Sequence, residues 1–114
     1  MKTIIYHNPS CSKSREALNL LIDQKEDIEI INYMEGKLSK EELIDILNKL
    51  GVDPEVLVRK SEKIYKESFA EKNFTKNQWI DILVNNPILI ERPIVVKGKK
   101  AIIGRPPKNI IDIL

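Results

Sequence analysis

The feature that most constrains the fold is a strand–helix–strand pattern at the start of the chain. Residues 3–6 (TIIY) are apolar and predict a buried strand, which stops at the turn-forming residues 7–10 (HNPS). Residues 12–24 carry apolar side chains at helical spacing, and residues 28–33 are β-branched and aromatic. A strand, a helix and a strand in so short a segment make a βαβ unit, so the two strands should be parallel.

The middle of the chain is predicted to be helical because its helix start signals are unusually complete. Gly51 is placed to end the first of these helices, and Pro87 the last. The start signals are a capping box at Ser39 and Glu42, an N-cap at Asp53 followed by proline, and a second capping box at Thr75 and Gln78 with a Phe74–Trp79 staple.

The last quarter of the sequence returns to strand-like patterns. Residues 94–96 and 101–103 predict a β-hairpin, residues 104–107 (GRPP) interrupt it, and residues 109–114 predict a closing helix. The order is βαβ, a helical insert, then ββα. This order is typical of an α/β thioredoxin-like fold, a four-stranded mixed sheet with helices on both faces. We therefore predict a single domain over residues 1–114, with the insert at about 38–90.

Composition excludes several classes of protein. With 114 residues, 42% apolar and 32% charged, the chain reads as an ordinary globular domain. A net charge of +2 is too balanced for nucleic acid or an acidic membrane as main partner. No apolar run approaches the ~20 residues of a membrane span, and the N-terminal run is too short for a signal peptide. We expect a cytoplasmic protein, and nothing in the sequence indicates more than a monomer.

The only cysteine, Cys11, stands in the segment YHNPSCSKSRE with the only histidine, His7. Cys11 falls at the start of the first predicted helix, where free N–H groups and the helix dipole favour a thiolate. Hydrogen bonds from Ser14, Ser12 or Asn8, and a positive charge on His7 or Lys13, would favour it further. The alternative is an inert buried cysteine. One cysteine and one histidine at this spacing do not make a metal site, so we expect none.

Three arginines are candidates for binding an anion beside Cys11. Arg92 and Arg105 each precede a proline at the hairpin, and Arg59 lies in the segment VLVRKSEK. Guanidinium groups bind tetrahedral oxyanions through forked donors and would also lower the pKa of a neighbouring thiol. We expect that the loops at both ends of the hairpin cannot all reach Cys11, and the sequence leaves open which of them do. The alternative is that all three are surface arginines.

Four segments together resemble one known family. The segment IYHNPSCSKSR at residues 5–15 resembles the active-site segment of glutaredoxin-coupled arsenate reductases, and VLVRKSE, NNPILIERPIVV and IGRPP match later family segments in order and spacing. The resemblance runs from about Thr3 to Leu114. It implies the thioredoxin fold with a helical insert. It also implies these roles: Cys11 as nucleophile, His7 and Ser14 favouring its thiolate, Arg59, Arg92 and Arg105 binding the oxyanion, and Pro93 as the cis proline. Asn8 is a supporting residue through the hydrogen bond that it could add to the sulfur.

The resemblance also implies a reaction. The Cys11 thiolate would form an adduct with arsenate, and glutathione and glutaredoxin would resolve it to arsenite, with glutathione as co-substrate and no bound cofactor. The resolving thiols come from outside, which accounts for Ser14 where a redox motif would carry a second cysteine.

The segments CSKSRE and IGRPP are closer to a shorter, housekeeping-like branch than to the longer resistance-operon members. Two alternatives stay open. One is a monothiol glutathione-linked oxidoreductase with another substrate. The other is an RNA polymerase-binding regulator of the same fold, whose usual CxxC motif is not present at Ser14.

Overall fold

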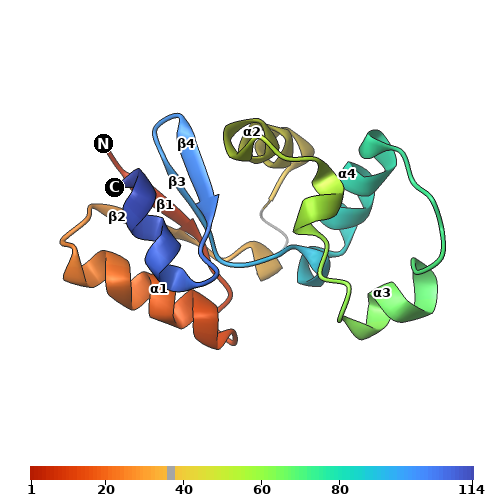
Figure 1. Ribbon diagram of the computed structural model, residues 1–114, viewed down its shortest axis with the longest axis horizontal. Coiled ribbons are helices and arrows are strands. Elements are labelled where there is room, and N and C mark those ends of the chain that lie inside the picture. The colour runs from red at the N-terminus through yellow and green to blue at the C-terminus, as the bar shows by residue number, and fades with distance from the viewer. Residues whose placement is uncertain (36–37) are drawn as a thin grey trace. The chain divides into compact units, whose positions relative to one another are not determined.

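A computed structural model describes residues 1–35 and 38–114 and divides the chain into two compact units. The first combines the residues before Leu38 with Arg92–Leu114, and the second is Leu38–Glu91. Figure 1 draws the first in red, orange and blue, and the second in yellow-green to cyan. Within residues 1–35 and 38–114, no helix has the length and apolar character needed to cross a membrane.

The first unit is built on a four-stranded mixed sheet. Its strands are β1 (Thr3–Tyr6), β2 (Ile28–Ile31), β3 (Ile94–Lys97) and β4 (Lys100–Ile103), in the order β2-β1-β3-β4. β1 runs parallel to β2 and antiparallel to β3, and β3 is antiparallel to β4. The predicted βαβ unit and hairpin are confirmed. β1 and β3 lie at the centre of the sheet, and most of their side chains are buried, as expected for strands covered on both faces.

Two helices pack side by side against this sheet, α1 (Ser12–Asp23) and the C-terminal 3₁₀ helix η4 (Pro107–Ile113) (Figure 1). Ala17 and Leu21 lie one turn apart on α1, so both point to the same side of the helix. They are fully buried with side chains from β1, β3 and η4, and the cluster is Ile5, Ala17, Leu21, Val95 and Ile110. This packing fixes the start of α1 at the carboxyl end of β1.

The second predicted strand is shorter than the sequence suggested. It ends at Ile31, because the side-chain oxygen of Asn32 accepts a hydrogen bond from the N–H of Met34 at 3.2 Å. An asparagine that bonds the backbone in this way favours a turn over a strand ladder. The 3₁₀ helix η1 (Tyr33–Glu35) follows and buries Tyr33.

The closing helix also differs from its prediction. It begins at Pro107, not at residue 109, and it is a 3₁₀ helix. Proline is favoured at a first helical position because its φ is already helical and its missing N–H would have had no partner. Within this turn the Asn109 side chain donates to the carbonyl of Arg105 at 3.1 Å.

The second unit contains α2 (Lys40–Leu50), η2 (Pro54–Leu57), α3 (Lys63–Ser68), α4 (Lys76–Asn85) and η3 (Pro87–Leu89). A short antiparallel bridge pairs Val58 with Ile90. The helical character of this segment is confirmed, although α3 carried no separate signal. Its buried side chains include Leu43, Ile46, Leu57, Leu83 and Leu89.

The capping predictions were met to different degrees. Thr75 and Gln78 form the complete capping box, and Phe74 meets Trp79 edge to face with ring centroids 4.9 Å apart. Gly51 ends α2 with a left-handed φ of 69°.

Two other caps are incomplete. The Ser39 hydroxyl accepts the N–H of Glu42 at 3.1 Å, which is half of the predicted box. Asp53 makes no cap hydrogen bond, and η2, which it precedes, is a 3₁₀ turn. The Asp53 carboxylate lies 3.1 Å from the Lys76 ammonium in an exposed pair.

Glu26 links three parts of the sheet. One of its carboxylate oxygens accepts hydrogen bonds from the Lys97 ammonium and from the Thr3 hydroxyl, both at 2.7 Å. The Lys97 bond, then the Thr3 bond, hold the pKa of Glu26 below its ordinary value. A carboxylate with a lowered pKa stabilises the fold at neutral pH, and this contribution is lost as pH falls through the native pKa.

We expect Glu26→Gln to flatten the dependence of the free energy of unfolding on pH between neutral and acid conditions. Denaturant unfolding of both proteins at a series of pH values measures this difference. Glu29→Gln, on the exposed side of β2, is the matched control and should leave the wild-type profile in place. Parallel profiles for wild type and Glu26→Gln would contradict the assignment.

Candidate functional site

Cys11 occupies the N-cap position of α1, directly after the turn that follows β1. Its backbone is extended there (φ −97°, ψ 123°), and its N–H donates to the carbonyl of Asn8 at 3.0 Å. The Asn8 side chain in turn accepts the N–H of Ser10 at 3.0 Å. Asn8 therefore shapes the turn from both its main chain and its side chain. The sulfur is left partly exposed at the positive end of a helix of 12 residues.

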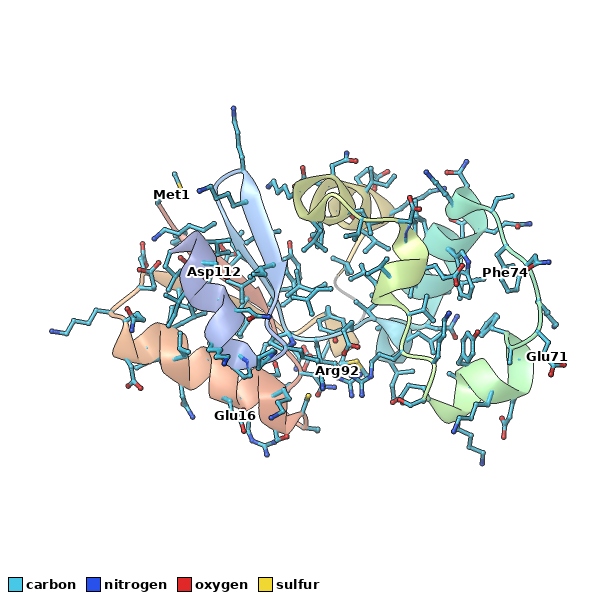
Figure 2. All side chains as sticks on the ribbon, viewed as in Figure 1. Met1, Glu16, Glu71, Phe74, Arg92 and Asp112 are labelled. Carbon is cyan, nitrogen blue, oxygen red and sulfur yellow. The ribbon has the colours of Figure 1, made fainter. Side chains whose placement is uncertain are left out.

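Arg92 and Arg105 both act on Cys11, which answers the question that the sequence left open, namely which of the hairpin loops reach the sulfur. In an antiparallel hairpin the start of the first strand and the end of the second lie at the same end. Ile94 pairs with Ile103, so the residues flanking them meet. The Arg105 Nη2 lies 3.4 Å from the Cys11 sulfur, and its Nε donates to the Arg92 carbonyl at 2.7 Å. Arg92, labelled in Figure 2, is only 9% exposed.

The two Arg–Pro peptide bonds are both cis. The family resemblance implied this for Arg92–Pro93, and it is confirmed; Arg105–Pro106 was not anticipated. Between the two segments, the N–H of Gly104 donates to the Pro93 carbonyl at 2.8 Å. A Cβ at Gly104 would lie 3.0 Å from the Pro93 ring and 3.1 Å from Ile110. The glycine in IGRPP is thus a positioning residue that sequence reasoning missed.

The surroundings of Cys11 favour its thiolate. Burial by itself raises the pKa of the Cys11 thiol, but the backbone N–H of Ser14, the Arg92 side chain, the backbone N–H of Lys13 and the charge on Arg105 together lower it. The Cys11 side chain makes no cap hydrogen bond. The N–H groups at the start of α1 therefore favour the thiolate through their partial positive charge. The net result is a Cys11 pKa below that of an ordinary thiol, as a nucleophilic cysteine requires.

His7 and Ser14 form a buried pair behind the turn. The His7 Nδ1 lies 2.6 Å from the Ser14 hydroxyl, which also accepts the N–H of Asn8 at 3.0 Å. Burial, then the charge on Arg15, lower the pKa of His7. A neutral His7 is therefore favoured, and its Nδ1 can accept a hydrogen bond from the Ser14 hydroxyl. This favours a hydrogen-bonding role for His7 over the positive charge that the sequence suggested.

Ser14 also acts differently from its prediction. Its hydroxyl faces His7 and the Asn8 N–H, while its backbone N–H is the group that acts on the sulfur. Lys13 contributes its backbone N–H, and its ammonium lies 3.6 Å from the Glu16 carboxylate. Ser12 is exposed.

Arg15 is a second residue that sequence reasoning missed. Its Nη1 donates to the Pro9 carbonyl at 2.9 Å and so ties the first turn of α1 to the preceding loop. The signal in the sequence was its position four residues after Cys11, on the same side of the helix.

Arg59 belongs to the second unit. Its Nη1 lies 2.6 Å from the Glu91 carboxylate, and its Nε lies 3.6 Å from Glu62. A role for Arg59 in binding an oxyanion stays a prediction. Among residues 1–35 and 38–114, no three His, Cys, Asp or Glu side chains are grouped so that they could hold a metal ion.

The arrangement in the first unit can hold an anion against a nucleophile. Two guanidinium groups and a helix N-terminus place positive charge around one sulfur, and this charge stabilises the thiolate. The same donors match the oxygens of a tetrahedral oxyanion, which would sit beside the sulfur that attacks it.

We expect Arg92→Ala and Arg105→Ala each to raise the pKa of Cys11, because each removes a positive charge that favours the thiolate. Ultraviolet absorbance of the thiolate, recorded against pH, measures the shift. Lys108→Ala removes an exposed cation from the same segment and serves as the control, for which the wild-type value should persist. Unchanged titration in both arginine variants would refute this view of the site.

Ser14→Ala should lower the free energy of unfolding by about 1–3 kcal/mol, because it leaves the buried Asn8 N–H without an acceptor. Its effect on the Cys11 pKa should be smaller than that of Arg92→Ala, since the backbone N–H of residue 14 is retained. Denaturant unfolding and thiolate titration of the same samples test both statements. A large rise in pKa at unchanged stability would show instead that the hydroxyl acts on the sulfur.

Known proteins match the whole of this architecture. The profile of the ArsC family covers residues 6–113. Uncharacterized protein YfgD of Escherichia coli (strain K12) is 44% identical over 96% of this chain and 94% of its own length. An arsenate reductase of Haemophilus influenzae is 40% identical over 100% of both chains. The solved structure of an arsenate reductase from Vibrio cholerae superposes with a TM-score of 0.94 at 40% identity, covering 100% of this chain and 98% of that one. The chain belongs to the ArsC family.

Proposed function

We propose that this protein is an arsenate reductase, which converts arsenate to arsenite through an adduct on Cys11. The observation that carries the proposal is the Cys11 sulfur of lowered pKa, 3.4 Å from Arg105 and beside the buried Arg92. Further support comes from the proteins named arsenate reductase that match the full length of the chain at 40% identity.

In the first step the Cys11 thiolate attacks the arsenic atom of arsenate. A sulfur–arsenic bond forms, an arsenic–oxygen bond breaks, and the oxygen leaves as water after taking up protons. Arsenic stays in its pentavalent state. Arg92 and Arg105 hold the oxyanion in line with the sulfur and offset the charge that develops on its oxygens. By the family resemblance, Arg59 would contribute a third guanidinium and the cis Pro93 would support the site. The turn shaped by Asn8 would keep the sulfur in place.

The reduction itself uses two external thiols. Glutathione displaces a second oxygen and forms its own sulfur–arsenic bond. A glutaredoxin thiolate then attacks the glutathione sulfur, so a disulfide forms and the broken sulfur–arsenic bond leaves its electron pair on arsenic. Arsenic is thereby reduced to the trivalent state while two thiols are oxidised to one mixed disulfide. Water releases arsenite and restores the Cys11 thiol.

This scheme needs no internal second cysteine and no bound cofactor. It requires a compartment in which glutathione stays reduced, so we assign the activity to the cytoplasm. We expect the protein to work as a monomer with glutaredoxin as its transient partner.

Arsenate-dependent oxidation of NADPH, in the presence of glutathione, glutaredoxin and glutathione reductase, tests the proposal. Wild type should be active, and Cys11→Ser should abolish the activity because it removes the nucleophile. Arg92→Ala and Arg105→Ala should each weaken arsenate binding by about 1–3 kcal/mol, the usual cost of a lost charge-assisted hydrogen bond.

Lys108→Ala should keep the wild-type rate in this assay and controls for the loss of any cation near the site. Activity that survives Cys11→Ser would rule out the proposed chemistry. Turnover of a glutathione mixed disulfide with no response to arsenate would replace it with a monothiol oxidoreductase acting on another substrate.

A further inference from the structure

The contact between Arg105 and Cys11 depends on where the main chain of Arg105 lies. The Arg105 Nη2 lies 3.4 Å from the Cys11 sulfur, and its Nε donates to the Arg92 carbonyl at 2.7 Å. An arginine side chain has several rotatable bonds, and it keeps one geometry only when its surroundings hold it. The Arg105 backbone, from which that side chain starts, therefore has to be fixed if the guanidinium is to stay at the sulfur.

The residues before Arg105 fix its backbone to the sheet. The Gly104 N–H donates to the Pro93 carbonyl at 2.8 Å, and the Arg105 N–H donates to the Ile103 carbonyl at 2.9 Å. Ile103 is the last residue of β4 and pairs with Ile94 of β3. On this side the position of Arg105 thus follows from the hairpin.

The residues after Arg105 cannot fix it in the same way, because the first two are prolines. Pro106 and Pro107 have no N–H group, so neither can donate a main-chain hydrogen bond. A side chain supplies a donor on this side: the Asn109 Nδ2 lies 3.1 Å from the Arg105 carbonyl oxygen. A carbonyl oxygen only accepts, so the nitrogen of the Asn109 amide is the atom that must face it.

Asn109 is itself held in place by η4. Its N–H donates to the Pro106 carbonyl at 3.0 Å, which is the spacing of a 3₁₀ turn. The next residue, Ile110, is fully buried in the cluster that also packs α1 against the sheet. Asn109 therefore ties the Arg105 carbonyl to the same core that fixes the start of α1, and with it Cys11.

We propose that Asn109 is a positioning residue that acts through Arg105. Its amide holds the Arg105 carbonyl and so directs the guanidinium to the Cys11 sulfur, and to an oxyanion bound beside it. The effect on an oxyanion rests on the proposed function, whereas the effect on the sulfur does not. The alternative is that the Asn109 side chain only stabilises the turn at the start of η4.

Asn109→Leu separates these two roles. Leucine has nearly the shape of asparagine and adds no charge, but it cannot donate to the Arg105 carbonyl. The guanidinium then spends less time at the sulfur, so we expect the Cys11 pKa to rise, and to rise less than in Arg105→Ala. Ultraviolet absorbance of the thiolate against pH measures both shifts. Asn109→Ala, which removes the amide altogether, should raise the pKa in the same direction.

The matched control is Ile113→Ala, which weakens the packing of η4 without touching the turn at Arg105. Ile113 packs against the core cluster from the end of η4, so its truncation should lower the free energy of unfolding and leave the Cys11 titration of the wild type in place. Denaturant unfolding shows that each variant is folded and how much stability it has lost. A role confined to stability predicts that Asn109→Leu, like this control, leaves the Cys11 pKa unchanged.

The double variant Arg105→Ala/Asn109→Leu tests whether Asn109 acts through Arg105. In an Arg105→Ala background the further change Asn109→Leu should leave the Cys11 pKa unaltered, because the guanidinium that Asn109 directs is gone. A further rise in this background would mean that Asn109 acts on the sulfur by another route, which contradicts the proposal.

The reductase assay extends the test to the oxyanion. Asn109→Leu should lower kcat/KM for arsenate by roughly two- to tenfold, a loss no larger than that of one charge-assisted hydrogen bond. Arg105→Ala should lower it further, and Ile113→Ala should keep the wild-type value.

An unchanged Cys11 pKa in Asn109→Leu, or an equal rise in Ile113→Ala, would overturn this role for Asn109. The proposed function is judged separately, by arsenate-dependent turnover that requires Cys11. A shifted titration in a protein without such turnover would keep the positioning role and remove the function. Wild-type turnover together with an unshifted titration in Asn109→Leu would remove the positioning role and leave the function standing.

Discussion

The site depends on positive charge gathered around a single sulfur. Burying a guanidinium is costly unless an anion is close, and Arg92 is almost entirely buried beside Cys11. The Cys11 thiolate is one anionic partner for this guanidinium, because the Arg92 side chain is among the groups that lower the Cys11 pKa. In the proposed function one set of groups would perform two tasks, because the charge that favours the thiolate would also attract the oxyanion that the thiolate attacks.

The rest of the first unit keeps these groups at the same end of the sheet. The hairpin places Arg92 and Arg105 together because its two free ends are adjacent. Gly104 has no side chain, so its backbone can lie close to the Pro93 ring and keep the two segments in contact. Packing of Ala17 and Leu21 against the sheet fixes the start of α1, and with it Cys11. Behind the turn, the His7–Ser14 pair occupies buried polar atoms that would otherwise lack partners.

Much of this could be predicted from sequence because the signals are local. The Thr75–Gln78 capping box, the Gly51 C-cap and the two apolar residues of α1 each depend on spacing of a few positions. The predictions were wrong where a side chain could bond to either of two partners. Asn32 bonded the backbone and ended a strand, and Asp53 paired with Lys76 in place of capping a helix. Sequence spacing does not reveal which partner a side chain takes, because the partner is set by the folded arrangement around it.

The sequence by itself determined the βαβ and hairpin order, the place of Cys11 at a helix start, and the arginines available to it. It determined these because strand and helix periods, turn residues and caps act over short distances along the chain. Only the tertiary structure decided that Arg92 and Arg105 both reach the sulfur, that His7 is favoured in its neutral form, and that Arg59 is held by Glu91 and Glu62. Those outcomes depend on burial and on contacts between residues far apart in sequence, which arise only when the chain has folded.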